Sequence, residues 1–128
     1  MSDVSAATLG RPRAASAASG ERPIDLVHLT RMTLGERSLE REVLELFDRQ
    51  AMLLLERMQS APSTALPSLA HTLKGSARAI GAGGVARAAE TVEFIGTVDQ
   101  AALRCALATL GAAIDEARAF IAELLRTY

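Results

Sequence analysis

The sequence predicts an all-α protein, an antiparallel up-down-up-down four-helix bundle with a short extra N-terminal helix. Hydrophobic residues make up 49% of the 128-residue chain, but aromatic residues only 3%. This composition favours interdigitating helices over a sheet, which is enriched in β-branched and aromatic side chains. Apolar residues recur at helical spacing from Pro23 to Tyr128, interrupted only by short turn signals. Because short turns force neighbouring helices to run antiparallel, these segments predict a bundle.

The chain divides into a tail and one compact domain. Residues 1–22 are rich in Ala, Ser and Gly and contain almost no large apolar side chains. Such a segment cannot offset the entropy that it would lose on ordering, so we expect a disordered tail. Residues 23–128 suffice for one helical domain that folds without disulfides or a metal ion.

The first two helices are predicted over 25–33 and 36–59. Asp25 is the expected N-cap of the first helix, and Leu34-Gly35 turns the chain after it. The second helix ends at the turn 60–63. Its apolar face is predicted to carry Leu39, Val43, Leu46, Phe47, Leu54 and Met58.

The third helix is predicted over 65–81. Ser63 or Thr64 is the expected cap, and Pro67 lies in the first turn, where its missing N–H costs little. The glycine-rich segment 81–84 ends the helix. The apolar arc of this helix contains Leu66, Leu69, Ala70, Leu73, Ala77 and Ile80.

The last two helices are predicted over 85–95 and 98–127. A capping box of Thr97 and Gln100 is expected to start the fifth helix. Cys105 lies among apolar residues of that helix, so we expect a packed thiol. The inward positions of the two helices are predicted to be Val85, Ala89, Val92, Leu103, Leu107, Leu110, Ile114, Ala117, Ile121 and Leu124.

The charge balance excludes several classes of function. The chain has 14 basic and 15 acidic residues, with a formal net charge of -1. Broad electrostatic attraction to nucleic acid or an anionic membrane is therefore not expected.

The sequence has no apolar run of about 18 residues and no secretory signal. We therefore expect a cytoplasmic protein, and a monomer.

No enzyme template fits the sequence. It lacks a phosphate-binding loop that ends in Lys-Ser/Thr, a His-Glu-x-x-His motif and a cysteine cluster, so we expect no cofactor or metal. The segment 81–84 follows a helix and lacks the partner lysine, which favours a helix stop. Of the two histidines, His28 has no polar side chains at helical spacing and is predicted to be a surface residue.

His71 lies in a more informative setting in the middle of the third helix. It falls about 140° from the apolar arc, and Lys74 and Arg78 lie within roughly 60° of it. Gly75 is one turn further along the same side. Neutral imidazole is a nucleophile at pH 7 without a neighbouring base, and cations can neutralise part of an added phosphoryl charge. An exposed histidine is, however, often only a solvated residue.

The residues around His71 resemble the signature of histidine phosphotransfer (HPt) domains. The matching stretches are His71-Thr72-Leu73-Lys74-Gly75-Ser76-Ala77, Ile80-Gly81-Ala82 and Val92-Glu93. Ile24-Asp25-Leu26 and residues 39–47 also resemble the family's entry segment and second helix. The resemblance covers about 24–128.

The resemblance implies a phosphorelay carrier, not an enzyme in its own right. His71 would accept a phosphoryl group from a receiver-domain aspartate or a sensor histidine kinase and pass it to another receiver. Lys74 matches the family's cation, which implies charge stabilisation, and Gly75 matches its small residue, which implies clearance for docking. Phe47 and Leu73 match buried positions. Mg²⁺ would belong to the receiver's acidic site, since this chain has no site of its own.

Two alternatives stay open on the sequence. The first is a helical interaction module without chemistry, in which Lys74 and Arg78 bind a partner together with an apolar edge formed by Leu44, Ala51 and Leu55. Arg78 and these three apolar residues are also the candidate partner-binding residues of a carrier. The second alternative is the phosphoacceptor domain of a chemotaxis-type kinase, which we disfavour because the chain starts at Met1 and ends after the last helix.

Overall fold

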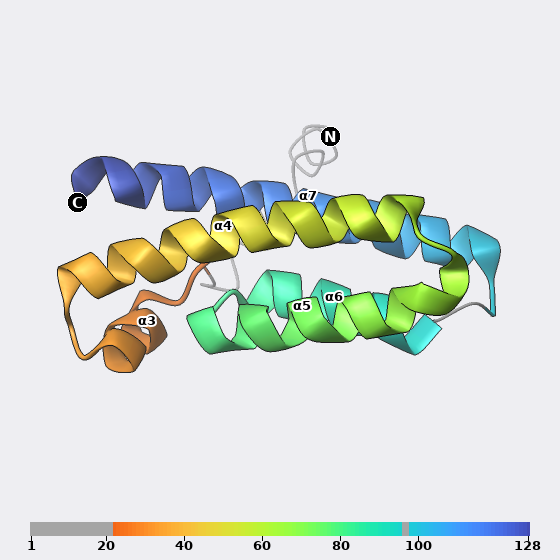
Figure 1. The fold of residues 1–128 in the computed structure, drawn as a ribbon, viewed down its shortest axis with the longest axis horizontal. Helices are drawn as coiled ribbons and strands as arrows, with labels where there is room; N and C mark the ends of the chain where they lie inside the picture. Colours follow the sequence, from red (N-terminus) through yellow and green to blue (C-terminus); the bar gives the residue numbers. More distant parts are fainter. Residues whose placement is uncertain (1–21, 96–97) are drawn as a thin grey trace, which may run out of the picture.

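The computed structural model describes residues 22–95 and 98–128. The helices in these residues are α3 (Leu26–Thr33), α4 (Arg37–Ser60), the 3₁₀ turn η1 (Ser63–Ala65), α5 (Leu66–Ile80), α6 (Gly83–Ile95) and α7 (Gln100–Thr127). Successive long helices alternate in direction, and α4 and α7 lie side by side over α5 and α6 (Figure 1). The predicted all-α fold is confirmed. The tail predicted for 1–22 lies outside the described residues, apart from Arg22.

One hydrophobic core runs through the bundle, and three helices bury the faces that the sequence predicts. In α5 the buried residues include Ala70 and Leu73, with Leu69 half-buried. In α6 Val85, Ala89 and Val92 are buried. In α7 the stripe from Leu103 to Ile121 is buried, with half-buried Leu107 and Leu124 packed against it.

The predicted apolar face of α4 is partly wrong. Leu39 and Leu46 are 37% and 58% exposed. The buried face is turned away from them and contains Glu40, Leu44, Phe47, Ala51, Leu54, Leu55 and Met58. The error has a physical cause: apolar residues occupy more than one side of this helix, so periodicity alone does not say which side meets the other helices.

Two helix starts also differ from the prediction. Asp99, not a capping box, caps α7 and accepts a hydrogen bond from the Ala102 N–H at 3.1 Å. Thr97 lies outside the described residues. No side chain of Ser63 or Thr64 caps α5, because η1 leads directly into it. Pro67 does lie in the first turn of α5, as predicted.

Cys105 is exposed, which contradicts the expected packed thiol. The inward side of the first turns of α7 is taken by Leu103, Ala106 and Leu110. Cys105 lies between these positions on the helix, where its side chain points out of the core.

A buried carboxylate joins three elements at one end of the bundle. Glu40 of α4 is 5% exposed and accepts a hydrogen bond from the Tyr128 hydroxyl at 2.9 Å. Thr33 Oγ1 of α3 lies 3.2 Å from the other Glu40 oxygen. Burial, together with the bond to Glu40, raises the pKa of Tyr128. The cluster ties α3 and the last residue of the chain to α4.

The junction of α3 and α5 orients the helix that carries His71. Asp25 caps α3 by accepting from the N–H groups of Val27 and His28, as predicted. The Asp25 N–H donates to the Gly81 carbonyl at 2.9 Å. Gly81 has a φ of 87°, and the Ala82 N–H returns to the Ala77 carbonyl at 2.8 Å, which ends α5 in a left-handed cap.

Replacing Gly81 by Ala should destabilise the protein by about 1–2 kcal/mol, because an L residue is strained at positive φ. An added Cβ would also lie 3.1 Å from the Asp25 carbonyl oxygen. Urea unfolding followed by circular dichroism measures the loss. Gly84→Ala is the matched control, since no atom lies within 4 Å of its added Cβ and its φ is not positive. Equal stabilities of the two variants would contradict the strain at Gly81.

Candidate functional site

His71 projects from the middle of α5 on the side away from the core. Its side chain is 68% exposed, while Ala70, one position before it, and Leu73, two positions after it, are fully buried. The predicted exposure of His71 is therefore confirmed. The helix fixes the Cα of His71, whereas the orientation of the ring depends on the contacts of the side chain.

Glu93 of α6 orients the ring. The distance from His71 Nδ1 to Glu93 Oε2 is 2.8 Å. A carboxylate can only accept a hydrogen bond, so Nδ1 carries the proton. In the neutral ring the lone pair then lies on Nε2. One ring nitrogen is thus bonded to Glu93 of α6, and the side chain that carries the other is mostly exposed.

Lys74 completes the arrangement by binding the second oxygen of Glu93. Its Nζ lies 2.7 Å from Glu93 Oε1, which is a buried atom. The hydrogen bond from Lys74, followed by that from His71, lowers the pKa of Glu93. The side chain of Lys74 is only 13% exposed. The sequence places Lys74 on the exposed side, but the structure shows it enclosed against α6.

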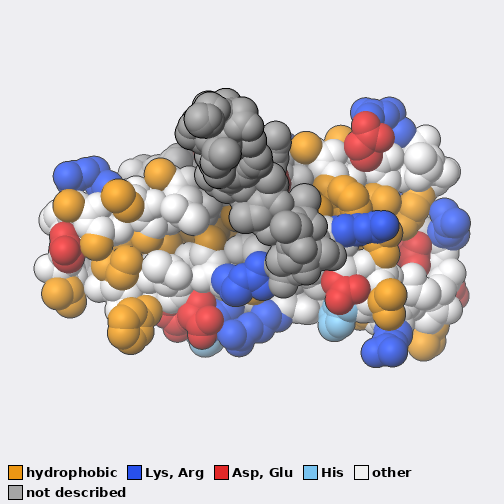
Figure 2. Space-filling view, turned by 180° about the vertical axis from the view of Figure 1, so that it is seen from behind, with side chains coloured by type: hydrophobic (Ala, Val, Ile, Leu, Met, Phe, Trp, Pro, Cys, Tyr) orange, Lys and Arg blue, Asp and Glu red, His pale blue; other side chains and the backbone are white. Residues whose placement is uncertain are grey.

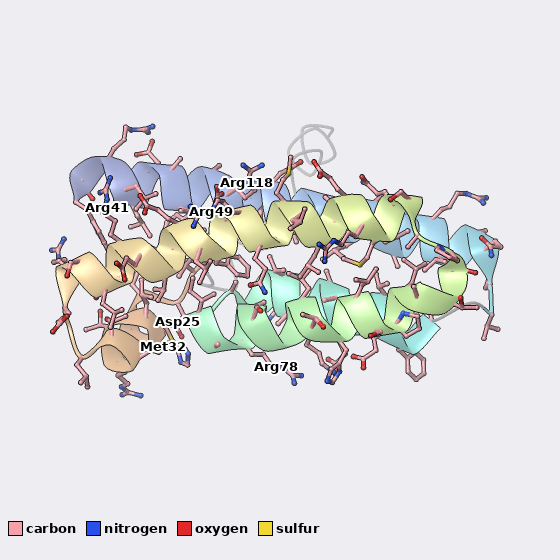
Figure 3. All side chains as sticks on the ribbon, in the orientation of Figure 1. Asp25, Met32, Arg41, Arg49, Arg78 and Arg118 are labelled. Atoms are coloured by element: carbon pink, nitrogen blue, oxygen red, sulfur yellow. The ribbon has the colours of Figure 1, made fainter. Side chains whose placement is uncertain are left out.

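Gly75 and Arg78 border the outer side of His71. No atom lies within 4 Å of a Cβ added at Gly75, so this part of the helix surface is open, as predicted. Arg78 forms an exposed ion pair with Glu90 of α6, with 3.6 Å between Nη2 and Oε2. Figure 3 shows the Arg78 side chain extending from the outer side of α5, away from α4 and α7.

The predicted apolar partner-binding edge is wrong. Leu44 and Ala51 are fully buried and Leu55 is 9% exposed, because these residues form the core-facing side of α4. They cannot contact a partner while the bundle is folded. The interaction module predicted as an alternative therefore loses its apolar contact surface.

The second histidine lies apart from this site. His28 is exposed, as predicted, but its Nε2 lies 2.9 Å from the Ala79 carbonyl at the end of α5. That bond gives His28 a role in joining α3 to α5. Sequence periodicity shows no such partner, because it comes from a carbonyl 51 positions away.

The roles of Glu93 and Glu90 were not predicted from the sequence. Both lie on α6, three residues apart, and both pair with groups of α5. A signal was present: the buried residues Ala89 and Val92 fix which side of α6 faces the core, and Glu90 and Glu93 follow each of them by one position. Their partners depend on which helix lies alongside, which periodicity does not tell.

The rest of the surface of the described residues has a mixed charge. Figure 2 shows basic and acidic side chains interspersed on the back of the molecule, without a broad area of one sign. Residues 22–95 and 98–128 contain no group of three or more His, Cys, Asp and Glu side chains arranged to hold a metal ion. None of the helices in these residues has the length and apolar character that a bilayer span needs.

The fold and the site define a class: a helical bundle that presents an exposed imidazole whose ring is oriented by a carboxylate of the neighbouring helix. The model of the Hpt domain family matches residues 41–125 of the chain. The protein therefore belongs to the Hpt domain family. Hpt domains are histidine phosphocarrier modules of phosphorelays, and they interact with the receiver domains and kinases of two-component systems. The searches of curated proteins and of solved structures gave no match.

The bridge that Glu93 forms between Lys74 and His71 predicts how the Glu93 carboxylate titrates. Because Lys74 is the main cause of the lowered pKa of Glu93, Lys74→Met should move that pKa back up toward its ordinary value of 4.5. The stability that the bridge contributes is present above pH 4.5 and is lost as the pH falls through the lower folded-state value. Carboxyl ¹³C NMR titration measures the change. An unchanged Glu93 midpoint in the variant would show that Lys74 does not hold the carboxylate in solution.

Proposed function

We propose that His71 is the phosphoacceptor of this Hpt domain and that its Nε2 carries the phosphoryl group. The observation that supports the proposal is the bond from His71 Nδ1 to Glu93, which engages one ring nitrogen of a side chain that is 68% exposed and leaves Nε2 as the nitrogen for the phosphoryl group. On this proposal, His71 accepts the group from a receiver aspartate or a sensor histidine kinase and passes it to another receiver.

In the proposed transfer, His71 attacks phosphorus directly, and no base has to remove a proton from Nε2 first. The Nε2 lone pair attacks phosphorus, and the bond between phosphorus and the aspartyl oxygen breaks, so that the receiver carboxylate leaves with the electron pair. The ring then carries both the phosphoryl group and the Nδ1 proton and is positively charged. Glu93, 2.8 Å from Nδ1, stabilises that charge and can accept the proton. Transfer to the next receiver reverses these steps.

Lys74 acts in this proposal by holding Glu93 charged and in place. Its ammonium also supplies positive charge near the phosphoryl group, as the family resemblance implies. The Mg²⁺ that neutralises the aspartyl phosphate belongs to the receiver. The protein thus contributes only half of an active site. It acts as a carrier because its partners supply the other half.

A receiver has to approach His71 closely, and one feature of the exposed surface favours this. Gly75 leaves the helix surface open one turn from the imidazole. On α4, which packs beside α5, Leu46 and Leu53 are 58% and 48% exposed. These two residues are seven positions apart and share one side of the helix. We propose them, in place of the buried residues predicted from sequence, as the apolar residues of α4 that a partner contacts.

His71→Gln should abolish phosphoryl acceptance and leave the helical content and Tm nearly unchanged, since an exposed side chain contributes little packing. The measurement is acid-labile, base-stable label on the protein after mixing with a phosphorylated receiver. Pairwise transfer against the receivers of the source genome identifies the partner. His28→Gln is the matched control and should accept the label as wild type does. If the label persists on His71→Gln and disappears from His28→Gln, His28 is the acceptor and the proposal is wrong.

Stability and transfer should move in opposite directions at Gly75. Gly75→Ala should stabilise the protein by about 0.5–1 kcal/mol, because Ala loses less backbone entropy in a helix. Gly75→Gln should also fold, since the position is open, but its side chain would stand where a receiver has to enter. We expect slow transfer from a phosphorylated receiver to the Gln variant. A folded Gly75→Gln protein that transfers at the wild-type rate would refute the clearance role, and an unfolded one would show that Gly75 serves packing.

A further inference from the structure

The ion pair between Arg78 and Glu90 is the loosest contact around His71. Its shortest distance is 3.6 Å, and the two side chains are 59% and 55% exposed. The neighbouring pair of Lys74 and Glu93 is 2.7 Å long, with a Lys74 side chain that is 13% exposed. Exposed pairs contribute little free energy, so the Arg78 guanidinium can leave Glu90 at small cost.

Arg78 and His71 share one side of α5. Seven residues of α-helix make almost two turns, and the rise between the two Cα atoms is about 10.5 Å. Side chains of a helix lean toward its N-terminus, so Arg78 leans toward His71 along the helix surface. Together, an extended arginine side chain and a phosphorylated imidazole are long enough to cover this distance.

The surface at Gly75, between these two side chains, is open. Gly75 lies between them on the same side of α5, and no atom is found within 4 Å of a Cβ placed there. Any other residue at this position would put a side chain in the path from Arg78 to the imidazole. The open surface that a receiver would use is thus also a path for the guanidinium.

Lys74 is less available to a phosphoryl group than Arg78. It neutralises the buried Oε1 of Glu93, and the same carboxylate holds His71 Nδ1. A full move of Lys74 toward the phosphoryl group would leave that buried oxygen without its cation, which is costly. Arg78 leaves behind only the exposed Glu90, which water can solvate.

We propose that Arg78 is a phosphoryl-binding residue that exchanges partners: it pairs with Glu90 in the free protein and with the phosphoryl oxygens on His71 Nε2 in the phosphorylated protein. The inference rests on the proposed function of His71. Phosphorylation adds about 1.5 to 2 negative charges, and a guanidinium can bind two phosphoryl oxygens at once. Glu90 keeps the cation next to the site until that charge arrives.

The test uses the whole chain without any partner. Phosphoramidate phosphorylates His71 as the bond from phosphorus to its nitrogen breaks and ammonia leaves. The phosphoryl pKa is then measured by ³¹P NMR titration. Arg78→Gln should raise this pKa by roughly half to one unit, because a nearby cation favours the dianion. Arg41→Gln is the matched control: it also removes an arginine from an exposed ion pair, that with Glu45, and should leave the phosphoryl pKa unchanged.

Glu90→Gln tests the exchange itself. Loss of the competing carboxylate should lower the phosphoryl pKa, and this effect should largely disappear in the double variant with Arg78→Gln. Equal effects of Glu90→Gln with and without Arg78 would overturn the exchange, and identical titrations of wild type and Arg78→Gln would overturn the phosphoryl contact. If phosphoramidate labels His71→Gln as strongly as wild type, the proposed acceptor fails instead, so the two failures are distinguishable.

Discussion

The close packing of α5 against α6 is the constraint on which the site depends. These two helices make the most extensive helix–helix contact in the described residues. Their buried faces are rich in alanine: Ala70 and Ala77 on α5 and Ala86, Ala88 and Ala89 on α6. Small side chains let helix axes approach more closely than large ones do. A glutamate on α6 therefore reaches two side chains of α5 at once, and it contacts both within 2.8 Å.

The carboxylate of Glu93 combines a structural and a chemical role. Toward Lys74 it forms a largely enclosed ion pair that joins α5 to α6 near the surface. Toward His71 it accepts a hydrogen bond from the Nδ1–H group and so favours one rotation of the ring and one tautomer. The two roles reinforce each other. A carboxylate held by an ammonium stays ionised at neutral pH and remains an acceptor for the imidazole.

Sequence analysis predicted most of the fold and the centre of the site, for a physical reason. The apolar arc of α5 is narrow, so helical periodicity alone places His71 on the outside and Leu73 on the inside. No knowledge of the other helices is needed. The same method failed on α4, where Leu46 and Leu44 compete for the core and only contact with the neighbouring helices decides between them. It also failed for Cys105, whose apolar neighbours in sequence are not its neighbours in space.

The bridge of Glu93 was beyond sequence analysis for a related reason. Periodicity assigns each residue an angle on its own helix, whereas a contact across two helices also depends on their relative height. The register of α6 against α5 follows from the turn at Gly81 and Ala82, where the left-handed conformation of Gly81 sends the chain directly into α6. The turn was predicted as a helix stop over 81–84, but Gly83 and Gly84 belong to α6, so the predicted start of that helix was two residues late.

The two ring nitrogens of His71 divide the requirements of a carrier. A phosphoryl carrier has to hold its nucleophile still and also leave it open to partners of different shape, and a single functional group seldom satisfies both demands. Here Nδ1 is bonded to Glu93 of α6 at the surface of the bundle and Nε2 is not part of that bond, so the ring is held through one nitrogen while the side chain stays mostly exposed. On the proposed function, orientation is completed before any partner arrives, and each partner contributes only the metal and the leaving or accepting carboxylate. Transfer in both directions then uses one geometry, because the same nitrogen attacks in one step and leaves in the next.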